Sequence, residues 1–157
     1  IVGICSSGPH SNGYSLIRKL LLKHSPPKNI LNALLRPTTI YSLFVNDCLE
    51  CNIPVKGIAH ITGGGLTENI PRILPKTIAA QIDMSAWRQP SAFKWIQEKG
   101  KISTNEMLKI FNCGIGLALV IDKKYLSDLN KCITKHRLKS FVIGKTIKRD
   151  SSAINYY

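Results

Sequence analysis

Two stretches of this sequence combine glycines with hydroxyl, amide and imidazole side chains, the residue types that bind phosphate and move protons. The first, Ser6-Ser7-Gly8-Pro9-His10-Ser11-Asn12-Gly13, joins an apolar segment to an amphipathic one. Free backbone N–H groups and the positive end of the dipole favour an anion where a helix begins. The serine hydroxyls and the Asn12 amide add donors, and His10 can donate a hydrogen bond or move a proton. The pattern therefore predicts a phosphate-facing loop, with a capped turn as the alternative.

The second stretch, residues 60–69, places three consecutive glycines after a strand-like segment and before a helical one. Consecutive glycines are unfavourable for folding because each loses much backbone freedom. They suit a place where backbone must approach a ligand or adopt a positive φ, so we predict a cradle for a phosphate or polar substrate. A flexible loop is the alternative. The stretch matches neither GxxxxGK[ST] nor GxGxxG.

Alternating strands and helices are expected to position these loops. Apolar runs predict strands, helical periodicity predicts helices, and Ser103 with Glu106 has capping-box spacing. Ser11 or Asn12 is expected to cap the first helix, and Thr38 or Thr39 the second. The pattern predicts a layered sheet with helices on its faces, the sense of the strands being open. The predicted strands are 1–6, 57–61, 78–82, 114–121 and 141–147, and the helices 12–23, 38–49, 90–99, 103–111 and 123–136, with a short helical segment after residue 67.

Composition describes one folded domain. The chain has 157 residues, 44% of them hydrophobic, and a formal net charge of +13. The length suits a single core, and no apolar run approaches a membrane span of about 20 residues. The charge raises the alternative of a basic nucleic-acid-binding module. Because the basic residues are dispersed, with the densest stretch at 131–149, a solvated surface explains them, and we expect neither a nucleic-acid nor a membrane partner.

The five cysteines give no disulfide framework, because their number is odd and their spacing irregular. Cys48 and Cys51 form a CxxC pair, but no second pair with zinc-ligand spacing is apparent. We therefore predict free thiols in a reducing cytosol and no metal site.

Four motifs in order resemble phosphoribosylformylglycinamidine cyclo-ligases, also called AIR synthases, over nearly the whole chain. They are residues 6–16, 35–41, 59–65 with 68–72, and 111–116. The similarity is to the family's C-terminal domain, and it implies an α+β fold, a three-layer α/β/α arrangement with a mixed β-sheet flanked by helices. Because residues 1–5 read as the middle of a strand, we expect residues 1–157 to be a domain of a longer chain. The resemblance implies that the missing part is the family's N-terminal, ATP-binding half.

The resemblance implies a cytoplasmic, ATP-dependent ligase of purine biosynthesis, homodimeric when full length. It would convert formylglycinamidine ribonucleotide to 5-aminoimidazole ribonucleotide with release of ADP and phosphate. Mg²⁺ would be held mainly by the absent half, so we expect the fragment alone to be inactive. Alternatives within the same superfamily are thiamine-monophosphate kinase, selenophosphate synthetase and the amidotransferase one step earlier in the pathway.

The resemblance also implies site residues. His60 is the candidate for a catalytic role in proton handling, and the backbone of the glycine stretch would line the nucleotide or the transferring phosphate. His24 and His136 are expected to be merely exposed. The candidate substrate-binding and nucleotide-binding residues are Ser7, His10, Ser11, Asn12, Thr62, Gly63, Gly64, Gly65 and Asn69.

Overall fold

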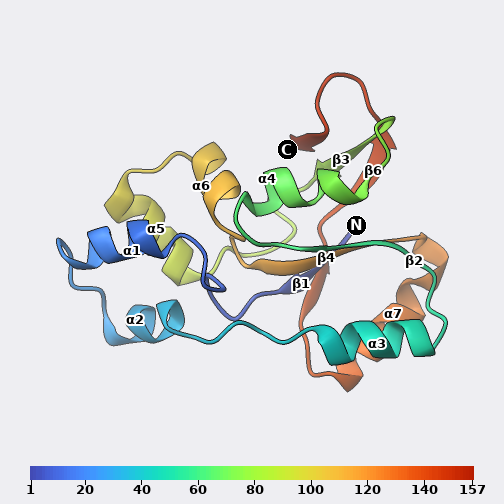
Figure 1. Cartoon of the computed structure of the whole chain (residues 1–157), viewed down its shortest axis with the longest axis horizontal. Coiled ribbons are helices and arrows are strands. Elements are labelled where there is room, and N and C mark those ends of the chain that lie inside the picture. Colours follow the sequence, from blue (N-terminus) through green and yellow to red (C-terminus); the bar gives the residue numbers. More distant parts are fainter.

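The computed structural model describes all of residues 1–157, with seven strands and seven α-helices (Figure 1). The strands are β1 (Val2–Cys5), β2 (Val55–His60), β3 (Ile78–Ile82), β4 (Ile115–Ile121), β5 (Ser140–Val142), β6 (Gly144–Lys148) and β7 (Ile154–Tyr156). The helices are α1 (Tyr14–Leu21), α2 (Lys28–Leu34), α3 (Ser42–Glu50), α4 (Gly65–Asn69), α5 (Ser91–Gly100), α6 (Thr104–Ile110) and α7 (Leu126–Lys135).

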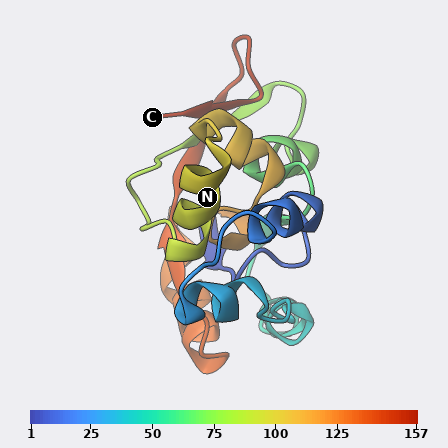
Figure 2. The ribbon, with the colours of Figure 1, turned by 90° about the vertical axis from the view of Figure 1, so that its left-hand side faces the viewer.

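The larger sheet has the strand order β2-β4-β1-β5, and every pair in it is antiparallel. Helices cover both of its faces. In Figure 1, α3 and α7 lie on one side of this sheet and α4 and α6 lie on the other. Figure 2, turned by 90°, shows α1, α2 and α5 together at one end, where α5 packs against both other helices. The predicted arrangement of helices on the faces of a sheet is confirmed.

Alternation along the central strands divides the apolar residues between two cores. Successive strand residues point to opposite faces, so Leu117 and Leu119 of β4 enter a core of 11 buried residues beneath α3 and α7. Ala118 faces the other way, into a core of 24 buried residues formed with α1, α2, α4, α5 and α6. Ile115 joins this larger core although two residues separate it from Leu117, because the pairing of β4 with β1 shifts register between Leu117 and Ile115. The loop that follows β1 and the loop that follows β2 lie at the same end of the larger sheet, where the two cores meet.

The smaller sheet has the order β6-β3-β7. Its pairing is mixed, because β3 is antiparallel to β6 and parallel to β7. The mixed pairing implied by the resemblance is therefore found in this sheet. The strand predicted at 141–147 is divided between the sheets, since Ile143 turns into the larger core between β5 and β6.

The capping predictions have different outcomes. Ser103 and Glu106 form the expected capping box at α6. The caps predicted for the first two helices are wrong, because α1 begins after Gly13 in the left-handed conformation and α3 begins after Tyr41, neither with a side-chain cap. Helix α2 has no counterpart among the predicted helices.

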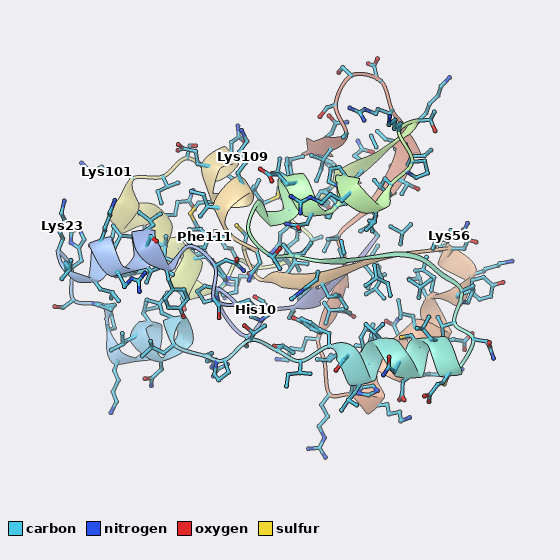
Figure 3. The ribbon with its side chains drawn as sticks, in the orientation of Figure 1. His10, Lys23, Lys56, Lys101, Lys109 and Phe111 are labelled. Atoms are coloured by element: carbon cyan, nitrogen blue, oxygen red, sulfur yellow. The ribbon has the colours of Figure 1, made fainter.

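The positive charge of the chain is carried on its surface. The lysines labelled in Figure 3 are exposed, Lys23 and Lys101 at the helical end and Lys56 at the opposite end, so the positive charge is dispersed. All five cysteines are free, as predicted. None of the helices has the length and apolar character needed to cross a membrane.

Candidate functional site

His10 is the centre of the loop between β1 and α1, and Figure 3 places it beside the connection from α2 to α3. The residue is 4% exposed. The backbone N–H groups of Ser7 and Thr39 donate to Nε2 over 3.0 and 3.4 Å. Because Nε2 accepts, the proton of the neutral ring is assigned to Nδ1, which is buried and has no hydrogen-bond partner. His10 thus joins two chain segments far apart in sequence.

Burial lowers the pKa of His10 from 6.5 to about 4, and the neighbouring charge of His60 acts in the same direction. A buried imidazole resists protonation because its charged form loses hydration. At neutral pH His10 is therefore an uncharged ring that accepts backbone hydrogen bonds. This favours a positioning role over the proton transfer that the sequence also allowed.

We expect His10 to make stability fall as the pH drops from about 6.5 to about 4. In that window the unfolded ring binds a proton and the folded ring does not, whereas above it both are neutral. One such group contributes a slope of up to about 1.4 kcal/mol per pH unit. Urea unfolding across this range measures the slope, and His10→Gln should reduce it. Equal slopes in the two proteins would contradict the assignment.

The loop carries several left-handed residues as it enters α1. His10, Ser11 and Gly13 have φ values of 52, 62 and 72°. The Asn12 side-chain amide donates to the His10 carbonyl over 2.8 Å and holds this turn. The backbone N–H groups of Ser11 and Gly13 have no partner within the chain. Unpaired N–H groups in such a turn form a concavity suited to an anion.

In the glycine loop, residues 60–69, the side chain of Asn69 fixes the backbone in the way that Asn12 does in the first loop. Asn69 is 5% exposed. Its amide donates to the carbonyl oxygens of Gly65 and Gly63 over 2.8 and 3.1 Å. Its carbonyl oxygen accepts from the Thr62 hydroxyl over 3.4 Å. These bonds make Asn69 a positioning residue of the loop. The N–H groups of Gly63 and Gly64 remain unpaired.

The fold brings the two loops together. The position of a Cβ on Gly63 would lie 3.7 Å from the Asn12 side-chain oxygen, the nearest atom to it. Ser7 is less available, because its hydroxyl donates to the Pro37 carbonyl over 2.7 Å. The accessible parts of the candidate site are therefore Ser11, Asn12 and the backbone of residues 63–64, with Thr62 half-buried beside them.

Tyr41 connects the two histidines of the site. Its ring centroid lies 6.0 Å from that of His10 and 6.0 Å from that of the exposed His60. Its hydroxyl donates to the Cys5 carbonyl over 2.9 Å, and burial raises its pKa to about 12. Gly116 is needed here, because a Cβ would lie 2.1 Å from the Tyr41 hydroxyl and 2.6 Å from His10. The site predicted from sequence omits Tyr41 and Gly116, although both fall in motifs that carry the resemblance.

Asn112 is a further residue that the predicted site omits. It is 1% exposed and makes three hydrogen bonds that fix the start of the first loop. Its amide donates to the Gly8 carbonyl over 2.9 Å, and its oxygen accepts from the Ser6 hydroxyl over 3.0 Å and from Gly114 N–H over 2.9 Å. The motif at residues 111–116 is the signal that could have found it.

Replacing Asn112 with alanine should destabilise the domain by about 2–4 kcal/mol, because two of its partners, the Gly8 carbonyl and the Gly114 N–H, would be left unpaired in the interior. Chemical denaturation measures this loss. The exposed Asn130 provides a matched control, since its side chain has no hydrogen-bond partner and Asn130→Ala should change stability by less than about 0.5 kcal/mol. A similar, small effect of both substitutions would show that Asn112 does not hold the loop.

The unpaired N–H groups of the site suit a phosphate, but its side chains do not suit Mg²⁺. Magnesium is usually held by carboxylates together with substrate phosphates. The nearby carboxylate is Glu68, which is exposed and pairs with Arg72 over 3.2 Å. Where Mg²⁺ binds in the complete enzyme therefore stays a prediction.

The fold and the paired glycine loops define a class of layered α/β domain. HypE of E. coli, described as a hydrogenase maturation protein, superposes with a TM-score of 0.62 at 15% identity, over 99% of this chain and 45% of that one. Thiamine-monophosphate kinase of Stenotrophomonas maltophilia gives the same TM-score at 15% identity, covering 99% and 49%. At these identities the likeness establishes the fold alone.

The family follows from sequence. The model described as "AIR synthase related protein, C-terminal domain" matches residues 1–156, and the chain belongs to this family. Phosphoribosylformylglycinamidine cyclo-ligase of Prochlorococcus marinus is 40% identical over 92% of this chain and 45% of its own length. That of Staphylococcus saprophyticus is 44% identical over 94% and 45%. The human trifunctional purine biosynthetic protein adenosine-3 is 42% identical over 95% and 16%. The chain thus spans less than half the length of these relatives.

Proposed function

We propose that residues 1–157 are the C-terminal domain of an ATP-dependent phosphoribosylformylglycinamidine cyclo-ligase. The complete enzyme would close the imidazole ring of formylglycinamidine ribonucleotide and release ADP and phosphate. Support comes from the family match and from relatives of that name. The proposal includes a cytoplasmic, homodimeric enzyme whose N-terminal half supplies most of the ATP and Mg²⁺ contacts.

The observation that carries this proposal is the meeting of two phosphate-suited loops from distant parts of the chain. Unpaired N–H groups of Ser11 and Gly13 lie on one loop, and those of Gly63 and Gly64 lie on the other. The two loops are close together, because a Cβ on Gly63 would lie 3.7 Å from the Asn12 side-chain oxygen. A substrate phosphate and a transferring phosphate both require fixed donors, because such chemistry depends on positioning and charge stabilisation.

Each residue of the site has a distinct role in this proposal. ATP would supply the phosphoryl group that activates the amide oxygen, and Mg²⁺ would offset the charge of its phosphates. The backbone of residues 63–64 donates hydrogen bonds to phosphate oxygens, and Asn12 orients a polar group of the substrate. His60, exposed at the end of β2, exchanges a proton at a ring nitrogen. The buried Tyr41 and His10 position these residues through ring packing and through hydrogen bonds to the first loop.

An apolar surface beside the first loop supports contact with another domain. Leu35, Ile40 and Leu43 are 62, 79 and 68% exposed, and they flank the segment whose Pro37 and Thr39 bond to Ser7 and His10. Exposed apolar side chains close together often mark an interface. In the proposal this surface contacts the N-terminal half, which couples that half to the loop.

A chimera tests the proposal. Residues 1–157 would replace the matching segment of a curated cyclo-ligase relative, in a bacterial strain that lacks its own enzyme. We expect growth without added purine and release of ADP that depends on formylglycinamidine ribonucleotide. The relative's remaining N-terminal part alone, and residues 1–157 alone, should support neither. A folded chimera with no such activity, or one that releases ADP only with thiamine monophosphate, would overturn the proposal.

A further inference from the structure

Helices α3 and α7 bring sulfur, imidazole and carboxylate groups together on the face of the larger sheet opposite α4 and α6. Cys48 and Cys132 are buried between the two helices, and their sulfur atoms lie 3.5 Å apart. Three possible ligand atoms lie within 4.8 Å of one another: a carboxylate oxygen of Asp47, the sulfur of Cys132 and an imidazole nitrogen of His136. None of these residues belongs to the candidate site described above.

This spacing agrees with the dimensions of a tetrahedral zinc site. With Zn–S bonds of about 2.3 Å, two sulfur ligands of one ion lie about 3.8 Å apart. The observed 3.5 Å between the Cys48 and Cys132 sulfur atoms needs little adjustment. The imidazole Nε2 of His136 already lies 2.8 Å from the Asp47 carboxylate, so both groups point to the same place. The Phe44 ring packs edge-on against His136 with centroids 5.8 Å apart and fixes its orientation.

The sequence also carries a signal for this cluster. Cys132 lies in the last turn of α7, and His136, four residues later, is the C-cap residue that directly follows the helix. They form a C-x₃-H pair, the second ligand pair that a metal site beside Cys48 needs. His136 is correspondingly half-buried rather than merely exposed, with 20% of its side chain accessible.

We propose that one Zn²⁺ binds between α3 and α7 to Asp47, Cys132 and His136, whose ligand atoms already converge. Cys48, whose sulfur lies 3.5 Å from that of Cys132, completes the tetrahedron as the fourth ligand. Two thiolates, one carboxylate and a neutral imidazole would leave the occupied site with a net charge of −1. Lys135, whose amine lies 2.6 Å from the Asp47 carboxylate, balances that charge. The ion connects two helices that cover the smaller core and so stabilises that face of the domain.

An ion can reach the site from solvent. A pocket of about 310 Å³ opens between the helices and is lined by Asp47, Cys51, Cys132 and Lys135 among others. Cys51 is exposed at its edge. A disulfide between Cys48 and Cys132 is the competing fate of these thiols, but their sulfur separation exceeds the bond length of about 2.05 Å and both are free.

The test uses the 157-residue chain, purified under reducing conditions and stripped of metal. Titration with Co²⁺ as the probe should give a thiolate-to-cobalt charge-transfer band and tetrahedral d–d bands at one equivalent, and one equivalent of Zn²⁺ should remove them. Zn²⁺ should also raise the unfolding temperature. Elemental analysis of the protein before stripping measures the zinc content directly.

Variants identify the ligands. Cys132→Ser should abolish the charge-transfer band or weaken Co²⁺ binding at least about tenfold. His136→Gln, which removes a half-buried group, serves if Cys132→Ser does not fold. The half-buried Cys5 lies outside the cluster, so Cys5→Ser should bind as the unmodified chain does. Absence of the bands, bands unchanged by both ligand variants, or a Cys48–Cys132 disulfide in place of metal in the freshly isolated protein would overturn the proposal.

Discussion

Replacing Gly65 with alanine should destabilise the domain by at least about 4 kcal/mol or prevent folding, whereas Gly63→Ala should change stability by less than about 1 kcal/mol. These glycines are two positions apart in one run of three. The expected difference between them depends on what surrounds each α-carbon, since the residue type and the substitution are identical.

Gly65 has a φ of 56°, and a Cβ on it would lie 2.1 Å from the Leu108 carbonyl oxygen and 2.6 Å from that of Phe111. Both atoms are backbone, so the clash can be relieved only by moving α4 away from α6. Gly63 has no positive φ, and the nearest atom to its Cβ position is the Asn12 side-chain oxygen at 3.7 Å. Alanine fits there in ordinary contact.

Urea unfolding of the two variants and the parent chain measures the difference. Circular dichroism should show that Gly63→Ala keeps the parent spectrum, which makes it the matched control. Equal stability losses in the two variants would mean that the loop moves freely enough to absorb either side chain. The fixed cradle that the proposed function requires would then be excluded.

The second large effect should be on catalysis. In the active chimera, His60→Ala should lower kcat by about 10²- to 10⁴-fold, the contribution typical of a positioned proton-transfer group. KM should change little, because phosphate binding is assigned to backbone N–H groups. The His60 side chain is exposed and has no hydrogen-bond partner within the chain, so its loss should leave the unfolding temperature unchanged.

Two readouts separate catalysis from a structural role for His60. The pH dependence of kcat should lose one limb in His60→Ala, and His24→Ala should behave as the parent, because His24 lies outside both loops. A variant that keeps kcat and its pH profile would remove His60 from the mechanism. A matching loss in His24→Ala would indicate an unspecific effect.

Strong periodicity makes much of the fold predictable. The strand at 78–82 has its predicted bounds, and the capping box at Ser103 is present. Helix α2 escapes prediction because Pro26 and Pro27 resemble helix breaks, whereas Pro27 stands at the N-cap, where a missing N–H has no effect. The first helix cap is predicted to be a side chain, but a left-handed glycine forms it.

The candidate site is predictable in its loops and not in its supports. Glycines and hydroxyls after a strand are a local signal, which a sequence displays directly. The bond between Asn112 and Gly8 joins residues 104 apart, and Tyr41 meets His10 only through tertiary packing. The sequence also gives no sign that the polar atoms of Asn112 and Tyr41 matter, because their importance for the loop comes from their burial. The proposed zinc ligands also meet only through tertiary packing, since one pair lies on α3 and the other at the C-terminal end of α7.

The division of the interior into two cores has a consequence for motion. Helix α3 packs over the smaller one, and Tyr41, at its start, is a member of that core and a neighbour of both histidines. A region with few buried apolar contacts opens more readily than one with many. When α3 detaches, the support of the His10 loop is lost with it. A ligand on the loops should therefore slow amide hydrogen exchange along α3, which it does not touch, and metal between α3 and α7 should preorganise the loops for that ligand.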